Sequence, residues 1–206
     1  MITKQPQSKI DPDKQYTFSE IFELPGSTRD ILAAFGYELR NDIIDLPRSP
    51  IDEIAVSQLQ RRLYLHMERV GMDSETARRE FLASHVLSGL LEYSDAHIDV
   101  EHSVTSERLR GNIDYLLRGH ERIIVVEAKN DEMERGFRQL SVELIATAEN
   151  LSMQELYGIV TTGEFWRFGF LNADTKTITR DSNNYVAPTG LADLLAVLLG
   201  LLESDA

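Results

Sequence analysis

Two charged residues close an apolar run in the middle of the chain. Residues 123–126 are isoleucine and valine, and Glu127, Ala128 and Lys129 follow directly. Side chains alternate between the two faces of a β-strand, so a strand here places Glu127 and Lys129 on the same face. Asp114 lies in the preceding apolar segment, one turn upstream, and antiparallel pairing of the two segments would bring its carboxylate beside Glu127.

This combination of residue types suits the hydrolysis of a phosphodiester. Two converging carboxylates are hard oxygen ligands for Mg²⁺ or Mn²⁺, with waters and a substrate phosphate completing the octahedron. Such a metal polarises the phosphate and lowers the pKa of an attacking water, while Lys129 would orient that water and offset developing charge. Taken singly, each residue has a simpler interpretation as a solvated charge at a strand end. Their joint occurrence in apolar strands favours the catalytic interpretation.

Apolar periodicity predicts the elements that position these side chains. Three-to-four spacing indicates helices, and short runs rich in β-branched residues indicate strands. The predicted elements, in chain order, are helices at 50–70 and 73–93, strands at 98–104, 113–117 and 122–127, a helix at 132–151, strands at 157–161 and 165–171, and a helix at 191–202. The first three strands form a meander, and the helix after them is a crossover. A mixed sheet with helices on its faces is therefore expected, an α/β or α+β layered domain.

The segment before this pattern is predicted to be an addition to the core. Residues 1–16 are polar, and short amphipathic pieces follow before the helix that starts near Pro50. We therefore expect residues 1–72 to form an N-terminal extension with a helical segment packed on the core. Residues 73–206 would form the core itself, and the whole chain one globular domain.

Three short motifs resemble those of a known nuclease family. They are Gly111-x-x-Asp114-Tyr115, Glu127-x-Lys129 and, in the following helix, Gly136-x-x-Gln139-Leu140. Together with the order of the elements, they resemble the PD-(D/E)XK nuclease superfamily over roughly residues 74–171. In that family a helix bearing a glutamate precedes three strands, with the aspartate on the second strand and the ExK motif on the third. A crossover helix and a further strand follow.

The resemblance implies a fold and a set of roles. The fold is a restriction-endonuclease-like three-layer core of α/β class, with a central mixed β-sheet flanked by helices. Asp114 and Glu127 would be metal ligands, with the main-chain carbonyl of Ala128 as a third ligand and Lys129 as the catalytic lysine. Ile113 stands at the position of the family's proline. The implied cofactor is Mg²⁺ or Mn²⁺, and the implied activity is that of a Mg²⁺-dependent endonuclease acting on DNA.

Two further residues are candidates for helper roles. Glu80 is the preferred candidate for the family's helix glutamate, because it lies on a helical stripe that continues through apolar residues. The alternative is that Glu80 pairs with a neighbouring arginine at the surface; Glu75 and Glu92 are weaker candidates. Gln139, in the crossover helix, would hydrogen-bond a metal-bound water or a substrate group, or else be an ordinary exposed glutamine.

Composition bounds the setting in which this chemistry would occur. The 206 residues include no cysteine, which excludes disulfides and thiolate zinc sites and fits a reducing compartment, so we expect a cytoplasmic protein. The first residues lack the apolar stretch of a signal peptide, and the apolar run from Leu191 to Leu202 is too short to span a bilayer. No membrane role is expected.

The acidic balance leaves more than one function open. A formal net charge of −13 counts against a general DNA-binding surface, although it does not exclude a nuclease with a carboxylate-rich metal site. DNA is the expected substrate. The alternatives are a non-catalytic nuclease-fold binding module, a subunit of a larger restriction or repair assembly, or a hydrolase of another phosphoester or a nucleotide. A homodimer formed through residues 54–70 is a further possibility by analogy.

Overall fold

The computed structural model describes residues 10–119, 122–129 and 132–203. Its helices are α1 (Phe18–Glu23), α2 (Thr28–Ala34), α3 (Glu53–Arg69), α4 (Glu75–Arg78), a π-helical turn η1 (Arg79–Ala83), α5 (Ser84–Leu90), α6 (Met133–Leu151) and α7 (Leu191–Glu203). Its strands are β1 (Tyr16–Thr17), β2 (Glu38–Asp42), β3 (His97–Thr105), β4 (Leu109–Arg118), β5 (Ile123–Ala128), β6 (Glu155–Thr161), β7 (Phe165–Asn172), β8 (Thr177–Asp181) and β9 (Tyr185–Val186).

The strands form one mixed sheet. Its order is β1-β4-β5-β6-β7-β8-β2, with β3 paired to β4 and β9 paired to β7. Strands β3, β4 and β5 form the predicted antiparallel meander, whereas β5 and β6 are parallel. Parallel neighbours cannot be joined by a tight turn, and α6 supplies the crossover between them. The predicted α/β class with a central mixed sheet is confirmed.

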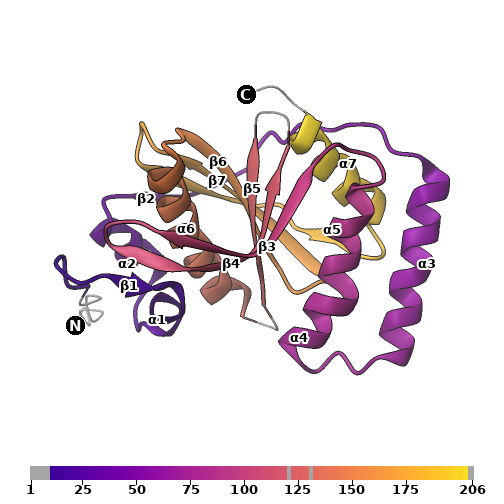
Figure 1. The fold of residues 1–206 in the computed structure, drawn as a ribbon, viewed down its shortest axis with the longest axis horizontal. Helices are drawn as coiled ribbons and strands as arrows, with labels where there is room; N and C mark the ends of the chain where they lie inside the picture. Colours follow the sequence, from indigo (N-terminus) through magenta and orange to yellow (C-terminus); the bar gives the residue numbers. More distant parts are fainter. Residues whose placement is uncertain (1–9, 120–121, 130–131, 204–206) are drawn as a thin grey trace, which may run out of the picture.

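Helices cover both faces of the sheet, which gives three layers (Figure 1). Helices α3, α5 and α7 bury their apolar residues in one core, and α1, α2 and α6 bury theirs in the other. Alternate residues of β5 serve the two cores: Val126 belongs to the first and Val125 to the second. This alternation is what a strand buried on both sides requires.

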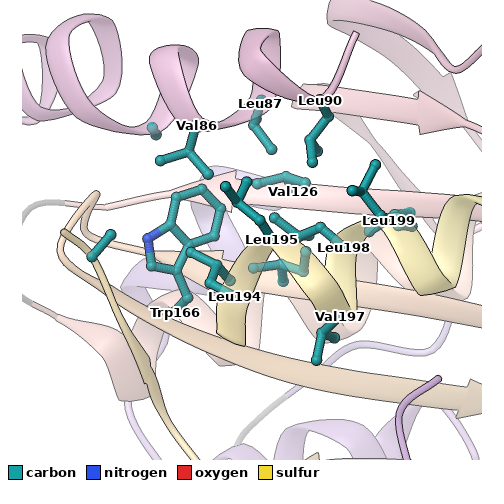
Figure 2. Packing of buried hydrophobic residues seen from close by; sticks show 14 of the residues in the cluster. Val86, Leu87, Leu90, Val126, Trp166, Leu194, Leu195, Val197, Leu198 and Leu199 are labelled. Carbon is teal, nitrogen blue, oxygen red and sulfur yellow. The ribbon is translucent and has the colours of Figure 1, made fainter. Parts of the chain in front are cut away.

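Helix α7 is buried along most of its length, whereas Ala192 and Asp193 in its first turn are exposed. Its leucines pack between α5 and strand residues such as Val126, with the Trp166 side chain beside them (Figure 2). Trp166 is fully buried, and its indole Nε1 donates a hydrogen bond to the Gly163 carbonyl at 3.0 Å. The described part of the chain contains no helix with the length and apolar character that crossing a membrane requires.

The structure differs from the predicted elements in the course of the second helix and in its additional strands, which are β1, β2, β8 and β9. The predicted second helix is capped by Ser74, whose hydroxyl accepts a hydrogen bond from the Ala77 amide, but it continues through the π turn η1 and ends at Leu90. Strands β1 and β2 lie inside the segment expected to be an addition, and both belong to the sheet. The N-terminal residues therefore contribute to the sheet as well as to the helical layers.

One glycine of α7 provides a direct test of the packing. A Cβ built on Gly200 would lie 2.4 Å from the Pro47 carbonyl oxygen, and that obstacle is backbone. Gly200→Ala is therefore expected to lower the free energy of unfolding by about 2 kcal/mol, although alanine favours a helix by about 1 kcal/mol. Urea unfolding midpoints measure this change.

Gly89 of α5 is the matched control. A Cβ there would lie 3.0 Å from the Leu59 Cδ2 atom, a side chain that can move. We expect Gly89→Ala to change stability by less than about 1 kcal/mol. A stabilised Gly200→Ala protein would contradict the close approach of α7 to residues 47–48.

Candidate active site

The candidate site lies where β4 and β5 separate. Their last paired residues in this direction are Tyr115 and Val126, so Asp114 and Glu127 are the next residues on the two strands. The main-chain amide of Ala128 donates a hydrogen bond to Asp114 Oδ2 at 2.8 Å. This bond fixes the Asp114 carboxylate at the end of β5, the strand that carries Glu127.

Glu127 and Lys129 form a close ion pair at this strand end. Lys129 Nζ lies 2.5 Å from Glu127 Oε1; the Glu127 side chain is 2 % exposed and that of Lys129 12 %. The Lys129 ammonium also lies 5.2 Å from the centre of the Phe22 ring on α1. Helix α6 comes close behind the lysine, since a Cβ on Gly136 would be 2.8 Å from Lys129 Cγ. The lysine is thus held between α1, α6 and the strand end.

Gln139 is buried and links Glu127 to a second buried carboxylate. Its side-chain Nε2 donates to Glu127 Oε1 at 2.7 Å and to Glu143 Oε1 at 2.9 Å. Glu143 is fully buried, and among the described residues its Oε2 atom has no hydrogen-bond partner. A buried polar atom without a partner costs a fold free energy. The exposed alternative for Gln139 is therefore excluded.

Glu143 was not predicted from the sequence. It stands four residues after Gln139, so the two share one face of α6. That spacing from Gln139 was the signal in the sequence; the structure adds that α6 is buried from Gly136 to Ala148, with Glu143 inside the buried stretch. Helix periodicity alone gave priority to the apolar residues and passed over it.

Burial shifts the protonation of both carboxyl groups. Burial raises the pKa of Glu127 well above its usual range, and the neighbouring Glu143 and Asp114 carboxylates add to that effect while Lys129 opposes it. Burial likewise raises the pKa of Glu143 to about 7, against hydrogen bonds from its neighbours. Burial acts to lower the pKa of Lys129, but attraction to Glu127 outweighs it and the pKa is raised. The charged form of Lys129 is therefore favoured, and both buried carboxyl groups keep their protons to higher pH than exposed glutamates do.

A second cation reaches the site from the π turn. Arg79 Nη1 lies 3.1 Å from Asp114 Oδ1 and 2.8 Å from Glu101 Oε1. Glu80, the preferred helix glutamate of the sequence analysis, has a side chain that is 54 % exposed and pairs with Arg79 at 3.6 Å. A π turn carries an additional residue per turn, so the helical spacing that aligned Glu80 with the buried stripe no longer holds.

Glu75 lies closer to the catalytic candidates than Glu80 does. Its Oε1 atom is 3.8 Å from Lys129 Nζ. Glu92 follows the end of α5 and is exposed. Of the three helix acids considered, Glu75 is the one for which the structure gives a contact with the Glu127–Lys129 pair.

The donor set is compatible with a small divalent cation. Asp114 and Glu127 supply carboxylate oxygens at one strand end, and Ala128 lies between them and Lys129 in the chain, with its carbonyl as the third expected ligand. Within the described ranges, no group of three or more histidine, cysteine, aspartate or glutamate side chains is arranged to hold a metal. A site with two carboxylates matches Mg²⁺ or Mn²⁺, which keep several waters, better than a cation that needs a closed protein cage.

Comparison with known proteins gives one partial similarity. No family model matches the chain. Over 131 residues the chain is 28% identical to Crinkler effector protein 5 of Phytophthora infestans, an alignment that covers 59% of this chain and 37% of that protein. The chain thus spans little more than a third of the length of the curated relative that it matches, and its similarity is to one part of an effector protein.

Proposed function

We propose that this protein is a metal-dependent nuclease of the PD-(D/E)XK type that hydrolyses phosphodiester bonds in DNA. The observation that carries the proposal is the pairing of Lys129 with buried Glu127 at the end of β5, beside an Asp114 carboxylate fixed by the Ala128 amide. Two carboxylates that can hold a divalent cation, with a lysine beside them, are suited to metal-assisted phosphodiester cleavage. The restriction-endonuclease-like interpretation of the fold is part of the same proposal.

Each residue has a role that follows from its surroundings. When bound, Mg²⁺ or Mn²⁺ supplies Lewis-acid polarisation of the phosphate and an acidified water. Asp114, Glu127 and the Ala128 carbonyl would hold the cation. Lys129 is protonated, and its ammonium group directs the attacking water and offsets negative charge that develops on the phosphate. Gln139 positions the Glu127 carboxylate by donating to it from α6.

A non-catalytic binding module is the second candidate. The formal net charge of −13 favours it, because a polyanion approaches an acidic protein against repulsion. The name of the partial relative describes an effector, a term that does not require an enzyme. The intact set of Asp114, Glu127 and Lys129 favours the nuclease over this alternative.

A titration of Mg²⁺ and Mn²⁺ into the purified chain, with cleavage assays on linear, supercoiled and single-stranded DNA, tests the proposal. We expect calorimetry to detect metal binding and the DNA to be cut in a reaction that EDTA stops. Asp114→Asn removes one carboxylate charge and is expected to lower cleavage by at least about 100-fold. Asp99→Asn is the matched control, because it also removes one carboxylate charge, that of an aspartate paired with Arg118 on the neighbouring strand. This variant should cut DNA at the wild-type rate.

The outcomes separate the candidates. Metal binding without cleavage of any DNA would support the binding module or a different phosphoester substrate. The absence of metal binding would exclude the catalytic proposal. Cleavage by Asp114→Asn at the wild-type rate would mean that the activity comes from another site.

A further inference from the structure

Arg79 occupies the carboxylate oxygen that a metal would use. Of the two Asp114 oxygens, Oδ2 accepts from the Ala128 amide at 2.8 Å and Oδ1 from Arg79 Nη1 at 3.1 Å. The donor of the first bond is a main-chain amide of β5, which cannot move while the strand is folded. The Arg79 bond belongs to a long side chain and is the one that can be exchanged for a metal.

The surroundings of Arg79 leave it free to change partner. Its side chain is 28 % exposed, compared with 12 % for Lys129. The same Nη1 atom lies 2.8 Å from Glu101 Oε1, and Nε lies 3.6 Å from Glu80 Oε1. Both of these acids are at least half exposed. If Arg79 leaves Asp114, these two acids can keep its guanidinium beside the site.

A guanidinium in this position is suited to a phosphate group. A divalent cation and Arg79 repel each other, so the two would compete for the same Asp114 oxygen. Arginine presents a planar fork of N–H donors that matches phosphate oxygens. A chain with a net charge of −13 also needs a cation beside its acidic site to receive a polyanion. The π turn that carries Arg79 is a kind of helix irregularity frequently found at functional sites.

We propose, resting on the nuclease function above, that Arg79 exchanges partners. In the metal-free protein it takes the place of the metal on Asp114 Oδ1, and once the metal displaces it, it binds a backbone phosphate of the DNA beside the site. Arg79 is thus a substrate-binding residue as well as a competitor of the metal. Removing Arg79 should therefore raise the affinity for the metal and lower the affinity for DNA, and an experiment can measure the two affinities separately.

Arg79→Gln should change metal affinity and DNA affinity in opposite directions. Calorimetry without DNA is expected to show Mn²⁺ binding a few fold tighter, because a competing cation is removed. Anisotropy of a labelled DNA duplex, with Ca²⁺ in place of Mg²⁺, is expected to show binding about tenfold weaker, the scale of one charge-assisted contact. The slope of the logarithm of affinity against that of salt concentration should fall by about 1.

Two further variants provide controls. Arg118→Gln breaks an exposed pair with Asp99 on β3 and β4, at similar exposure, and should leave both affinities unchanged. Arg79→Lys keeps the charge without the planar fork, so it should retain wild-type metal affinity and lose part of the DNA affinity. Unfolding midpoints confirm that each variant is folded. If Arg79→Gln is unfolded, the loss of DNA affinity in Arg79→Lys alone tests the inference.

The results distinguish this inference from the nuclease proposal. Weaker metal binding in Arg79→Gln would mean that Arg79 supports the metal site, and unchanged DNA binding would mean that it does not contact phosphate. Either result overturns the inference while wild-type cleavage stands. A wild-type protein that binds neither metal nor DNA overturns both.

Discussion

Lys129→Ala is expected to lower the rate of metal-dependent DNA cleavage about 10³-fold, the scale seen when one donor aimed at transition-state charge is removed. The lysine is 12 % exposed and its Nζ lies 2.5 Å from Glu127 Oε1, so its charge acts where water screens little. Single-turnover cleavage with metal and enzyme in excess measures the chemical step. Because Lys129 is not a metal ligand in this proposal, calorimetry should still detect metal binding in the variant.

The matched control is Lys14→Ala, which removes another lysine paired with a glutamate. Lys14 Nζ is 2.8 Å from Glu20 Oε1, but both side chains are close to half exposed and lie on the N-terminal segment. It should cut DNA at the wild-type rate. If Lys129→Ala cuts within about threefold of wild type while Lys14→Ala does the same, Lys129 has no catalytic role, since even general acid–base catalysis contributes about 100-fold or more.

The grouping of the site residues was predictable because it depends on short-range geometry. Period-two alternation placed Glu127 and Lys129 on one face, and the structure pairs them. A single turn between two apolar segments required antiparallel pairing, and β4 and β5 pair in this way up to Tyr115 and Val126. Neither inference needed a long-range contact. The metal and catalytic roles of these residues remain predictions.

The ends of the sheet were not predictable in this way. Strand β2 has one buried residue, Leu39, and its other residues are exposed, so it lacks the alternation that identifies a half-buried strand. It is a strand because it pairs in parallel with β8, which follows more than a hundred residues later. Strand β1 has two residues and owes its place to β4. Partners so distant in sequence leave no local pattern.

The helix acids show where periodicity gave a wrong position. Uniform helix spacing put Glu80 on the buried stripe, but the π turn that follows Arg78 leaves it exposed and paired with Arg79. Glu143 shows the opposite case, an acid within a stretch that α6 buries completely. In both cases the packing around the helix decides whether the acid is buried, and the spacing of residues in the sequence does not reveal that packing.

Glu143→Gln is expected to stabilise the metal-free protein above neutral pH. The pKa of Glu143 is raised by burial from 4.5 to about 7, so between these values the folded state binds more protons than the unfolded state. Stability therefore falls as pH rises from the unfolded value through the folded one, by about 3 kcal/mol for a shift of this size. Glutamine is neutral at every pH and keeps a similar shape, so the variant escapes this loss.

The size of the stabilisation by Glu143→Gln should depend on pH. Near pH 4.5 both proteins carry a neutral group at position 143, so their urea midpoints in EDTA should nearly coincide; at pH 8 the variant should be more stable by roughly 2 to 3 kcal/mol. Glu127, whose pKa burial also raises, leaves part of the pH dependence in place. Glu155→Gln, on the exposed first residue of β6, is the control and should follow wild type. A Glu143→Gln protein that is less stable than wild type at pH 8 would contradict this prediction. It would show that hydrogen bonds from neighbouring groups stabilise the ionised Glu143 carboxylate by more than its burial costs.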